Sequence, residues 1–167
     1  MASHLEPQQP RMMLVRINPL GAYDGSTSAE EGNFETCNFV EHDGHYYGAI
    51  PKKDRVDLRR LGGGSKDAFV NDVTVAWVAN RVVVGWYKNA TVYAEIQKPH
   101  PANAKINYRA TCLVHHGREL SEPERTFNVR EAGARFGRSR RWYPQAIKDR
   151  LLLNAFARTW RTREMHH

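Results

Sequence analysis

Hydrophobic and polar positions alternate along several short segments of the chain, which is typical of β-strands that bury one face. The strongest signal predicts a meander with strands over residues 72–79, 82–87 and 91–96, joined by turns at Asn80-Arg81 and at residues 88–90. In the first of these strands, Val73, Val75 and Trp77 fall on one face. The segment is rich in β-branched and aromatic residues, so we expect an antiparallel sheet here.

Weaker patterns extend this picture on both sides of the meander. We expect strands over residues 12–18, 106–114 and 124–129, a hairpin over 38–50 that turns at Asp43-Gly44, and a short helix or irregular strand within 54–67. Residues 20–36 are rich in Gly, Ser and acidic residues, which predicts a long loop. Pro144 suits the first turn of a helix, and apolar residues then recur at helical spacing to about residue 163.

The pattern as a whole predicts an α+β fold that is mainly β. We expect a strongly bent antiparallel sheet of roughly five to seven strands, or a small barrel, with a C-terminal amphipathic helix over residues 144–163. At 167 residues the chain fits one domain over 12–167, preceded by a flexible leader over 1–11. No segment approaches the apolar length of a membrane span, and Gly62–Lys66 lacks the glycine spacing of a phosphate-binding loop.

The charge of the chain is concentrated in its C-terminal segment. Residues 1–129 hold fifteen Lys/Arg and fifteen Asp/Glu, whereas residues 130–167 hold ten Lys/Arg and three acidic residues. The whole net charge of +7 therefore lies after residue 129. A basic surplus confined to one segment indicates a polyanionic partner, and its alternative is a solvated basic helix.

Cysteine and histidine patterns indicate neither a metal site nor a catalytic centre. Cys37 and Cys112 have no paired spacing, which argues against a disulfide framework or a zinc site and suits the reducing cytoplasm. His42 and His45 flank a predicted turn, where exposed polar residues are common. We expect no metal and no cofactor, and no catalytic arrangement that would make the chain an enzyme.

Aromatic and amide side chains meet in the stretch Gly85-Trp86-Tyr87-Lys88-Asn89. Alternation along a strand places Trp86 and Tyr87 on opposite faces, so that one can lie in the core while the other lines a cavity. An aromatic face beside an amide suits a planar base, because stacking gives affinity and the amide reads donors and acceptors. The alternative is that Trp86 is a core residue and Asn89 a turn former.

Arginines and aromatic residues are interleaved at residues 134–144, ARFGRSRRWYP. Arginine binds phosphate through two parallel hydrogen bonds, and glycine lets backbone N–H groups approach a phosphate closely. This combination favours contact with a nucleic-acid backbone over an unengaged basic loop.

The motifs HYYGAIP, RRLGGG, DVTVAWVA, VVVGWYKNATVYAE, ERTFNV and FGRSRRWYP resemble, over about residues 37–144, an N-terminal domain of bacterial HNH-type, modification-dependent restriction endonucleases. GWYKNATVY is the most specific of them. The chain is also similar to the wider PUA-like group, which includes SRA, EVE and YTH domains. It has no recognisable nuclease half, which suggests a stand-alone reader or a fragment of a longer protein that works with a nuclease. It also lacks an extended SRA signature beyond Tyr23-Asp24-Gly25.

The resemblance implies a small bent-sheet domain that binds double-stranded DNA carrying a modified base, with 5-methylcytosine or a related cytosine as the expected base. The base would turn out of the duplex into an aromatic pocket. The candidate pocket residues are Tyr47, Trp86, Tyr87, Asn89, Asp24 and Asn33, and the candidate backbone contacts are Lys88, Arg135, Arg138, Ser139, Arg140, Arg141 and Trp142. The alternatives are an RNA reader with the same fold, a small nucleotide-acting enzyme that uses His42 or His115 as base, and a protein-interaction module.

Overall fold

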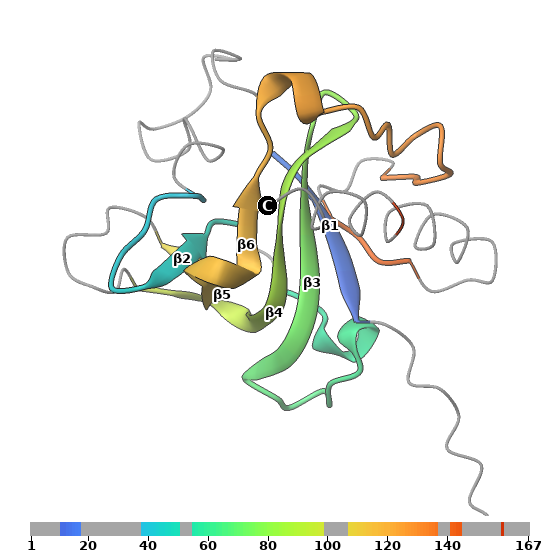
Figure 1. The fold of residues 1–167 in the computed structure, drawn as a ribbon. Helices are drawn as coiled ribbons and strands as arrows, with labels where there is room; N and C mark the ends of the chain where they lie inside the picture. Colours follow the sequence, from blue (N-terminus) through green and yellow to red (C-terminus); the bar gives the residue numbers. More distant parts are fainter. Residues whose placement is uncertain are drawn as a thin grey trace, which may run out of the picture.

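The computed structural model describes residues 11–17, 38–50, 55–98, 107–136, 141–144 and 158 of the chain. Within these residues the fold is mainly β and rests on one mixed sheet of seven strands (Figure 1). The strands are β1 (Met12–Arg16), β2 (His45–Gly48), β3 (Phe69–Ala79), β4 (Val82–Gln97), β5 (Tyr108–Leu113), β6 (Gly117–Glu119) and β7 (Arg141–Trp142). Short 3₁₀ helices are η1 (Leu58–Leu61), η2 (Val114–His116) and η3 (Glu122–Glu124).

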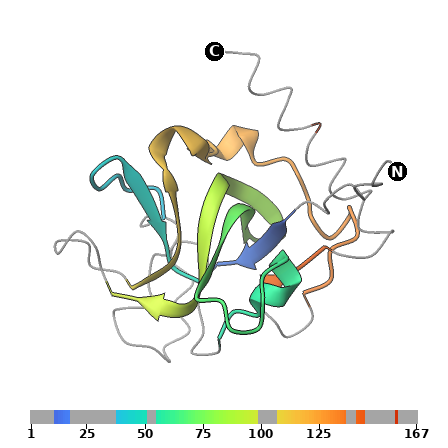
Figure 2. The same ribbon diagram turned by 90° about the horizontal axis from the view of Figure 1, so that it is seen from below.

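The sheet follows the order β2-β5-β4-β3-β1-β7, with β6 also pairing with β4. β1 runs parallel to β3, with Met12 opposite Thr74 and Arg16 opposite Val78, so the prediction of an entirely antiparallel sheet is wrong at this pair. Figure 2 shows the sheet curling around the β3–β4 hairpin, with β1 and β2 on opposite sides of it. No pairing joins β2 to β7 among the described residues, so the sheet curls but is not closed.

The β3–β4 hairpin is the centre of the fold. Asn80 and Arg81 connect the two strands, both with positive φ (49° and 68°), which is the backbone of a two-residue turn matched to strand twist. The predicted turn is therefore confirmed. The shared face of Val73, Val75 and Trp77 is confirmed as well, because all three belong to one buried cluster.

The predicted turn at residues 88–90 is wrong, because β4 continues through it from Val82 to Gln97. Instead the register with β3 shifts here, since Val75 lies opposite Tyr87 and Val73 lies opposite Ala90. Asn89, exposed and with φ of 47°, takes up the irregularity as a β-bulge. A bulge bends its strand without ending it. Polar residues of turn type at 88–90 thus indicate a bend and not a chain reversal.

The flanking predictions have mixed outcomes. The strand predictions near residues 12 and 108 are confirmed by β1 and β5, and a short helix is confirmed by η1. Asp43-Gly44 forms a turn with positive φ (50° and 77°), but β2 then pairs with β5 and returns to the first arm only at the His42–His45 bridge. Residues 124–129 form no strand, since Asn128 alone makes a bridge to Val82. The short strand β6 was not predicted.

Both faces of the central strands are buried, which explains their continuous hydrophobic character. One core contains Val73, Val75, Trp77 and Tyr87, and the other contains Ala76, Val78 and Trp86. The leader, the loop over 20–36 and nearly all of the predicted helix over 144–163 lie outside the described residues. No helix in the described ranges has the length and apolar character needed to cross a membrane.

Candidate functional site

Trp86 and Tyr87 lie on opposite faces of β4, as predicted, but both are core residues. Tyr87 is fully buried, its ring centroid lies 5.2 Å from that of Trp77, and its hydroxyl donates to the carbonyl of Asn38. Trp86 is 4% exposed and lies in the second core, where the guanidinium of Arg118 is 5.9 Å from its ring. Neither ring has an open face for a base. Their assignment to a binding pocket is therefore corrected to a role in the two cores.

Residues beside this pair are more accessible. Asn89 is exposed at the bulge of β4, and Lys88 before it is half-buried. The bulge position gives Asn89 a structural reason to be an amide residue, because Asn tolerates positive φ better than most residues. No neighbouring aromatic ring is placed against Asn89 by a described ring contact, so its predicted reading of a base stays a prediction.

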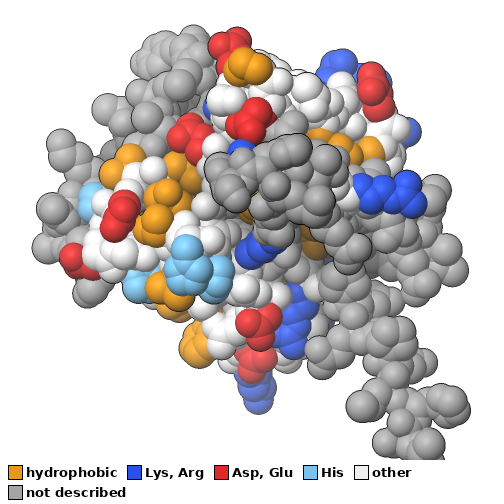
Figure 3. Space-filling view, viewed as in Figure 1, with side chains coloured by type: hydrophobic (Ala, Val, Ile, Leu, Met, Phe, Trp, Pro, Cys, Tyr) orange, Lys and Arg blue, Asp and Glu red, His pale blue; other side chains and the backbone are white. Residues whose placement is uncertain are grey.

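Tyr47 belongs to a row of four rings that crosses the sheet. We define the aromatic row as Tyr47 of β2, Tyr108 of β5, Tyr93 of β4 and Phe69 of β3. Successive ring centroids are 4.8, 5.9 and 5.8 Å apart. The three tyrosines are half-buried, and burial raises the pKa of Tyr47 and Tyr108. Figure 3 shows histidine and hydrophobic side chains close together at the β2–β5 end of the sheet.

The predicted phosphate contacts are only partly described. Arg135 is exposed, and its Nη1 donates to the carbonyls of Arg130 and Ala134. Arg141 and Trp142 form β7 and pair with Val15 and Leu14, which fixes this end of the arginine-rich stretch to the sheet. The remaining candidates lie outside the described residues: Asp24, Asn33, Arg138, Ser139 and Arg140.

A cavity of about 370 Å³ lies between η1, the loop after it and β4. We call it the η1 pocket, and it is lined by Arg55, Val56, Asp57, Leu58, Arg59, Gly64, Ser65, Asp67 and Ala94. Backbone hydrogen bonds position its walls against β4, since Ala94 accepts from Val56 N–H (3.0 Å) and donates to Ala68 (2.9 Å). The pocket therefore rests on the same strand that carries Tyr93.

Local sequence explains the shape of the η1 pocket. The carboxylate of Asp57 caps η1 by accepting from the backbone N–H of Arg59, and Gly62 ends the helix in the left-handed conformation that glycine adopts without strain. The loop then folds back, with Gly64 N–H donating to Asp67 Oδ2 at 2.7 Å. This amide thus already has a carboxylate partner within the chain.

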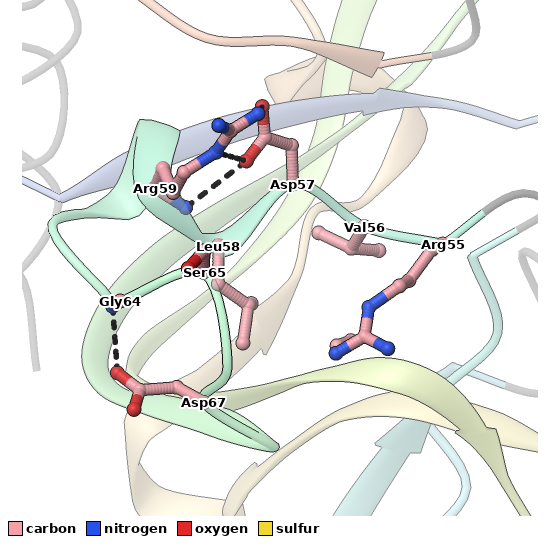
Figure 4. A pocket seen from close by; sticks show the side chains of 9 residues that line it. Arg55, Val56, Asp57, Leu58, Arg59, Gly64, Ser65 and Asp67 are labelled. Carbon is pink, nitrogen blue, oxygen red and sulfur yellow. Dashed lines mark hydrogen bonds and ion pairs between the residues drawn. The ribbon is translucent and has the colours of Figure 1, made fainter.

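The charged groups of the η1 pocket are held by neighbouring residues. Arg55 Nη1 lies 3.0 Å from Glu95 Oε1, and Arg59 Nε lies 2.9 Å from Asp57 Oδ1. The hydrogen bond from Arg59 lowers the pKa of Asp57, so this carboxylate is ionised at neutral pH. In Figure 4 the side chains of Arg55, Val56 and Leu58 extend toward the same space, with Asp67 across from them. Hydrogen-bond donors and acceptors therefore surround an apolar floor.

Sequence reasoning missed this pocket and most of the aromatic row. The charged residues of the η1 pocket are scattered over a segment whose sequence predicts only a short helix and a flexible link. Ala94 has no functional group that would mark it as part of a site. The aromatic row was partly visible, because Tyr47 and Tyr93 stand on predicted strands. Their meeting with Tyr108 and Phe69 depends on the strand order, which the pattern did not supply.

Two histidine rings lie close together at η2. His115 and His116 have ring centroids 4.1 Å apart at η2, but the described part of the chain contains no group of three or more His, Cys, Asp or Glu that could hold a metal ion.

No family model, no curated protein and no solved structure matches this chain.

Proposed function

We propose that the protein binds DNA that carries a modified cytosine and that the η1 pocket receives the base. The observation that carries this proposal is the pairing of guanidinium donors with carboxylate acceptors around an apolar floor. The resemblance of GWYKNATVY and FGRSRRWYP to modified-base reader domains supports the same class of ligand. The site differs from the aromatic pocket expected at Trp86 and Tyr87, because those rings are buried.

A cytosine edge offers an amine that donates and a carbonyl and ring nitrogen that accept. Carboxylates accept from the cytosine amine, and Asp67 lies at the pocket for that role. Arg55 supplies donors for the accepting side of the base. A 5-methyl group would contact Val56, Leu58 or Ala94, and burying one such group contributes about 0.8 kcal/mol.

The basic C-terminal segment suits the phosphate backbone in this proposal. All of the net charge lies after residue 129, and β7 joins that segment to the edge of the sheet through Arg141. Phosphate contacts give affinity that falls with salt and carry no sequence information. Discrimination between bases would then come from the pocket, and total affinity from the arginines.

The test is a binding panel of DNA duplexes that carry cytosine, 5-methylcytosine, 5-hydroxymethylcytosine or N6-methyladenine, with matched RNA. We expect the wild type to favour 5-methylcytosine over cytosine about fourfold, which corresponds to about 0.8 kcal/mol, and the Asp67→Asn variant to lose that preference while keeping its salt-dependent affinity. Glu122→Gln is the control, because it removes one exposed acidic charge in η3, outside the pocket. Equal binding of the wild type to all duplexes, or an unchanged preference in Asp67→Asn, would contradict the proposal. Tighter binding to the RNA would favour an RNA reader.

A further inference from the structure

Each of four adjacent strands contributes one ring to the aromatic row. Following the strand order, Tyr47 comes from β2, Tyr108 from β5, Tyr93 from β4 and Phe69 from β3. The pairing register places three of the rings on one face, since Tyr47 lies opposite Thr111, Thr111 opposite Thr91, and Phe69 opposite Tyr93. Tyr108 joins them through its ring contacts with Tyr47 and Tyr93. Residues directly opposite each other in a sheet project to the same side. The order of the strands in the sheet therefore brings these rings together.

The rings of the aromatic row are kept at the surface while other rings of the same strands are buried. Phe69 is 49% exposed, and Tyr47, Tyr93 and Tyr108 are half-buried. By contrast, Trp77 and Tyr87 on β3 and β4 are fully buried. Packing of the core therefore does not explain why these four positions are aromatic. A row of accessible rings across a sheet points to a ligand with flat faces.

Polar groups surround these rings. Thr91 Oγ1 donates to Asn71 Oδ1 at 2.8 Å, and Thr111 Oγ1 donates to the carbonyl of Tyr46 at 2.9 Å. Charged groups lie beside the row as well. Arg55 forms an ion pair with Glu95, two residues from Tyr93, and exposed Lys98 follows the end of β4. A rim of hydroxyl, amide and cationic groups around aromatic faces differs from the apolar patch of a stable protein interface.

The orientations of the rings are compatible with a ligand whose flat groups turn independently. Neighbouring rings of the aromatic row are inclined by 66°, 83° and 54°, so they do not form a common plane. Unpaired bases rotate independently about their backbone, so successive bases can stack on rings that are inclined to one another. Stacking of bases on aromatic side chains tolerates any sequence and works together with nearby positive charge. Exposed Lys98, at the end of β4, supplies one such charge.

We infer that the aromatic row binds single-stranded nucleic acid, with unpaired bases stacked on Tyr47, Tyr93, Tyr108 and Phe69. This surface is separate in function from the η1 pocket, and it does not require a modified base. It assigns a role to Tyr108 and Phe69, for which the duplex-reading proposal has no use. Exposed Lys98, which follows the end of β4, is the described cation that we assign to the phosphates of the strand.

The experiment measures fluorescence polarisation of labelled twelve-nucleotide oligo(dT) and oligo(U), with an unmodified duplex for comparison. Phe69→Ala and Tyr93→Ala should each weaken single-strand binding about tenfold, and Tyr93→Phe should retain it because the ring remains. Ile96→Ala is the matched control. Ile96 is 45% exposed on the same strand but is not one of the rings of the aromatic row.

The outcomes distinguish this inference from the proposed pocket. Asp67→Asn should leave single-strand binding unchanged, and Phe69→Ala should leave the preference between duplexes unchanged. Wild-type affinity for oligo(dT) and oligo(U) in both ring variants would overturn the inference, as would an equal loss in Ile96→Ala. Binding of a soluble β-glucan that the ring variants abolish, without oligonucleotide binding, would also overturn it. The ratio of the oligo(dT) and oligo(U) affinities tells which strand is preferred.

Discussion

Trp86 and Tyr87 are neighbours on β4, yet their side chains pack into two different cores. Tyr87 packs among Trp77, Phe39 and Tyr46, whereas Trp86 packs against residues such as Leu120 and Val129. The sheet is thus covered on both sides at its centre. The two large rings look like a binding motif in the sequence, but each of them packs into the core on one face of the sheet.

Both Trp86→Ala and Tyr87→Ala should therefore destabilise the protein. Truncating a large buried ring removes its contacts and leaves a cavity, at a typical cost of about 3–5 kcal/mol. Denaturant unfolding would measure this loss. A variant of either residue that retained wild-type stability while losing base discrimination would restore the pocket originally expected there.

Gly85→Ala should weaken the contact between β4 and β6. A Cβ atom at Gly85 would lie 2.4 Å from the Phe39 ring and 2.7 Å from the carbonyl oxygen of Arg118, and the backbone oxygen cannot move aside by a rotamer change. Forcing an atom into such a packed site costs about 1–3 kcal/mol. Gly64→Ala is the comparison, because the nearest atom there is 3.4 Å away, and it should change the free energy of unfolding much less.

Substitutions at Asn89 should separate conformation from chemistry. Its φ of 47° suits glycine and penalises a β-branched residue, so we expect Asn89→Val to lose about 1–2 kcal/mol and Asn89→Gly to stay within about 1 kcal/mol of the wild type. Thermal or denaturant unfolding measures both. If Asn89→Gly also abolished the preference for a modified duplex, the amide would have a binding role that its exposed bulge position does not explain.

Cys112 should resist alkylation in the folded protein. Its side chain is buried, and burial raises the pKa of the thiol to about 12, against about 8.5 in an unfolded chain. In a Cys37→Ser background, iodoacetamide at pH 9 should label Cys112 at least a hundredfold faster after addition of denaturant. Rapid labelling of the native state would mean that this part of the sheet opens readily.

The same thiol gives a stability change with a defined sign. Above about pH 8.5 the unfolded thiol ionises while the folded thiol stays protonated, so unfolding is increasingly favoured as the pH rises toward 12. Cys112→Ala should therefore flatten the alkaline decline of the free energy of unfolding relative to the Cys37→Ser parent. An unchanged slope would place the cause of the decline elsewhere.

Sequence patterns predicted the strands far better than their arrangement. Alternation identified β3 and the shared face of Val73, Val75 and Trp77, because periodicity in a strand directly reports its two faces. Residues 88–90, which include Asn89, were interpreted as a turn, since bulges and turns use the same residue types. Periodicity carries no information on which strands pair, so the parallel β1–β3 contact was not predicted.

The candidate site was harder to predict for the same reason. The rings at positions 47, 69, 93 and 108 meet only because β2, β5, β4 and β3 are adjacent in the sheet. The two rings that looked most like a pocket are neighbours in sequence, and that proximity is the only relation a short motif can report. Pocket walls at Arg55 and Asp67 are assembled from a loop that folds back on β4, which depends on backbone contacts at Ala94.

The parallel pairing of β1 with β3 has a consequence for how the chain acquires its structure. Met12 must find Thr74 across some sixty intervening residues, and β7 then joins Leu14 to Trp142 over more than twice that separation. Closing such large loops loses chain entropy before any contact compensates for it, so folding should be slow compared with a protein of local contacts. During synthesis the β3–β4 hairpin can form early, but one edge of β1 stays unpaired until residues 141–142 have been synthesised and can form β7. Over that interval the nascent chain exposes an unpaired strand edge, which is where aggregation would begin.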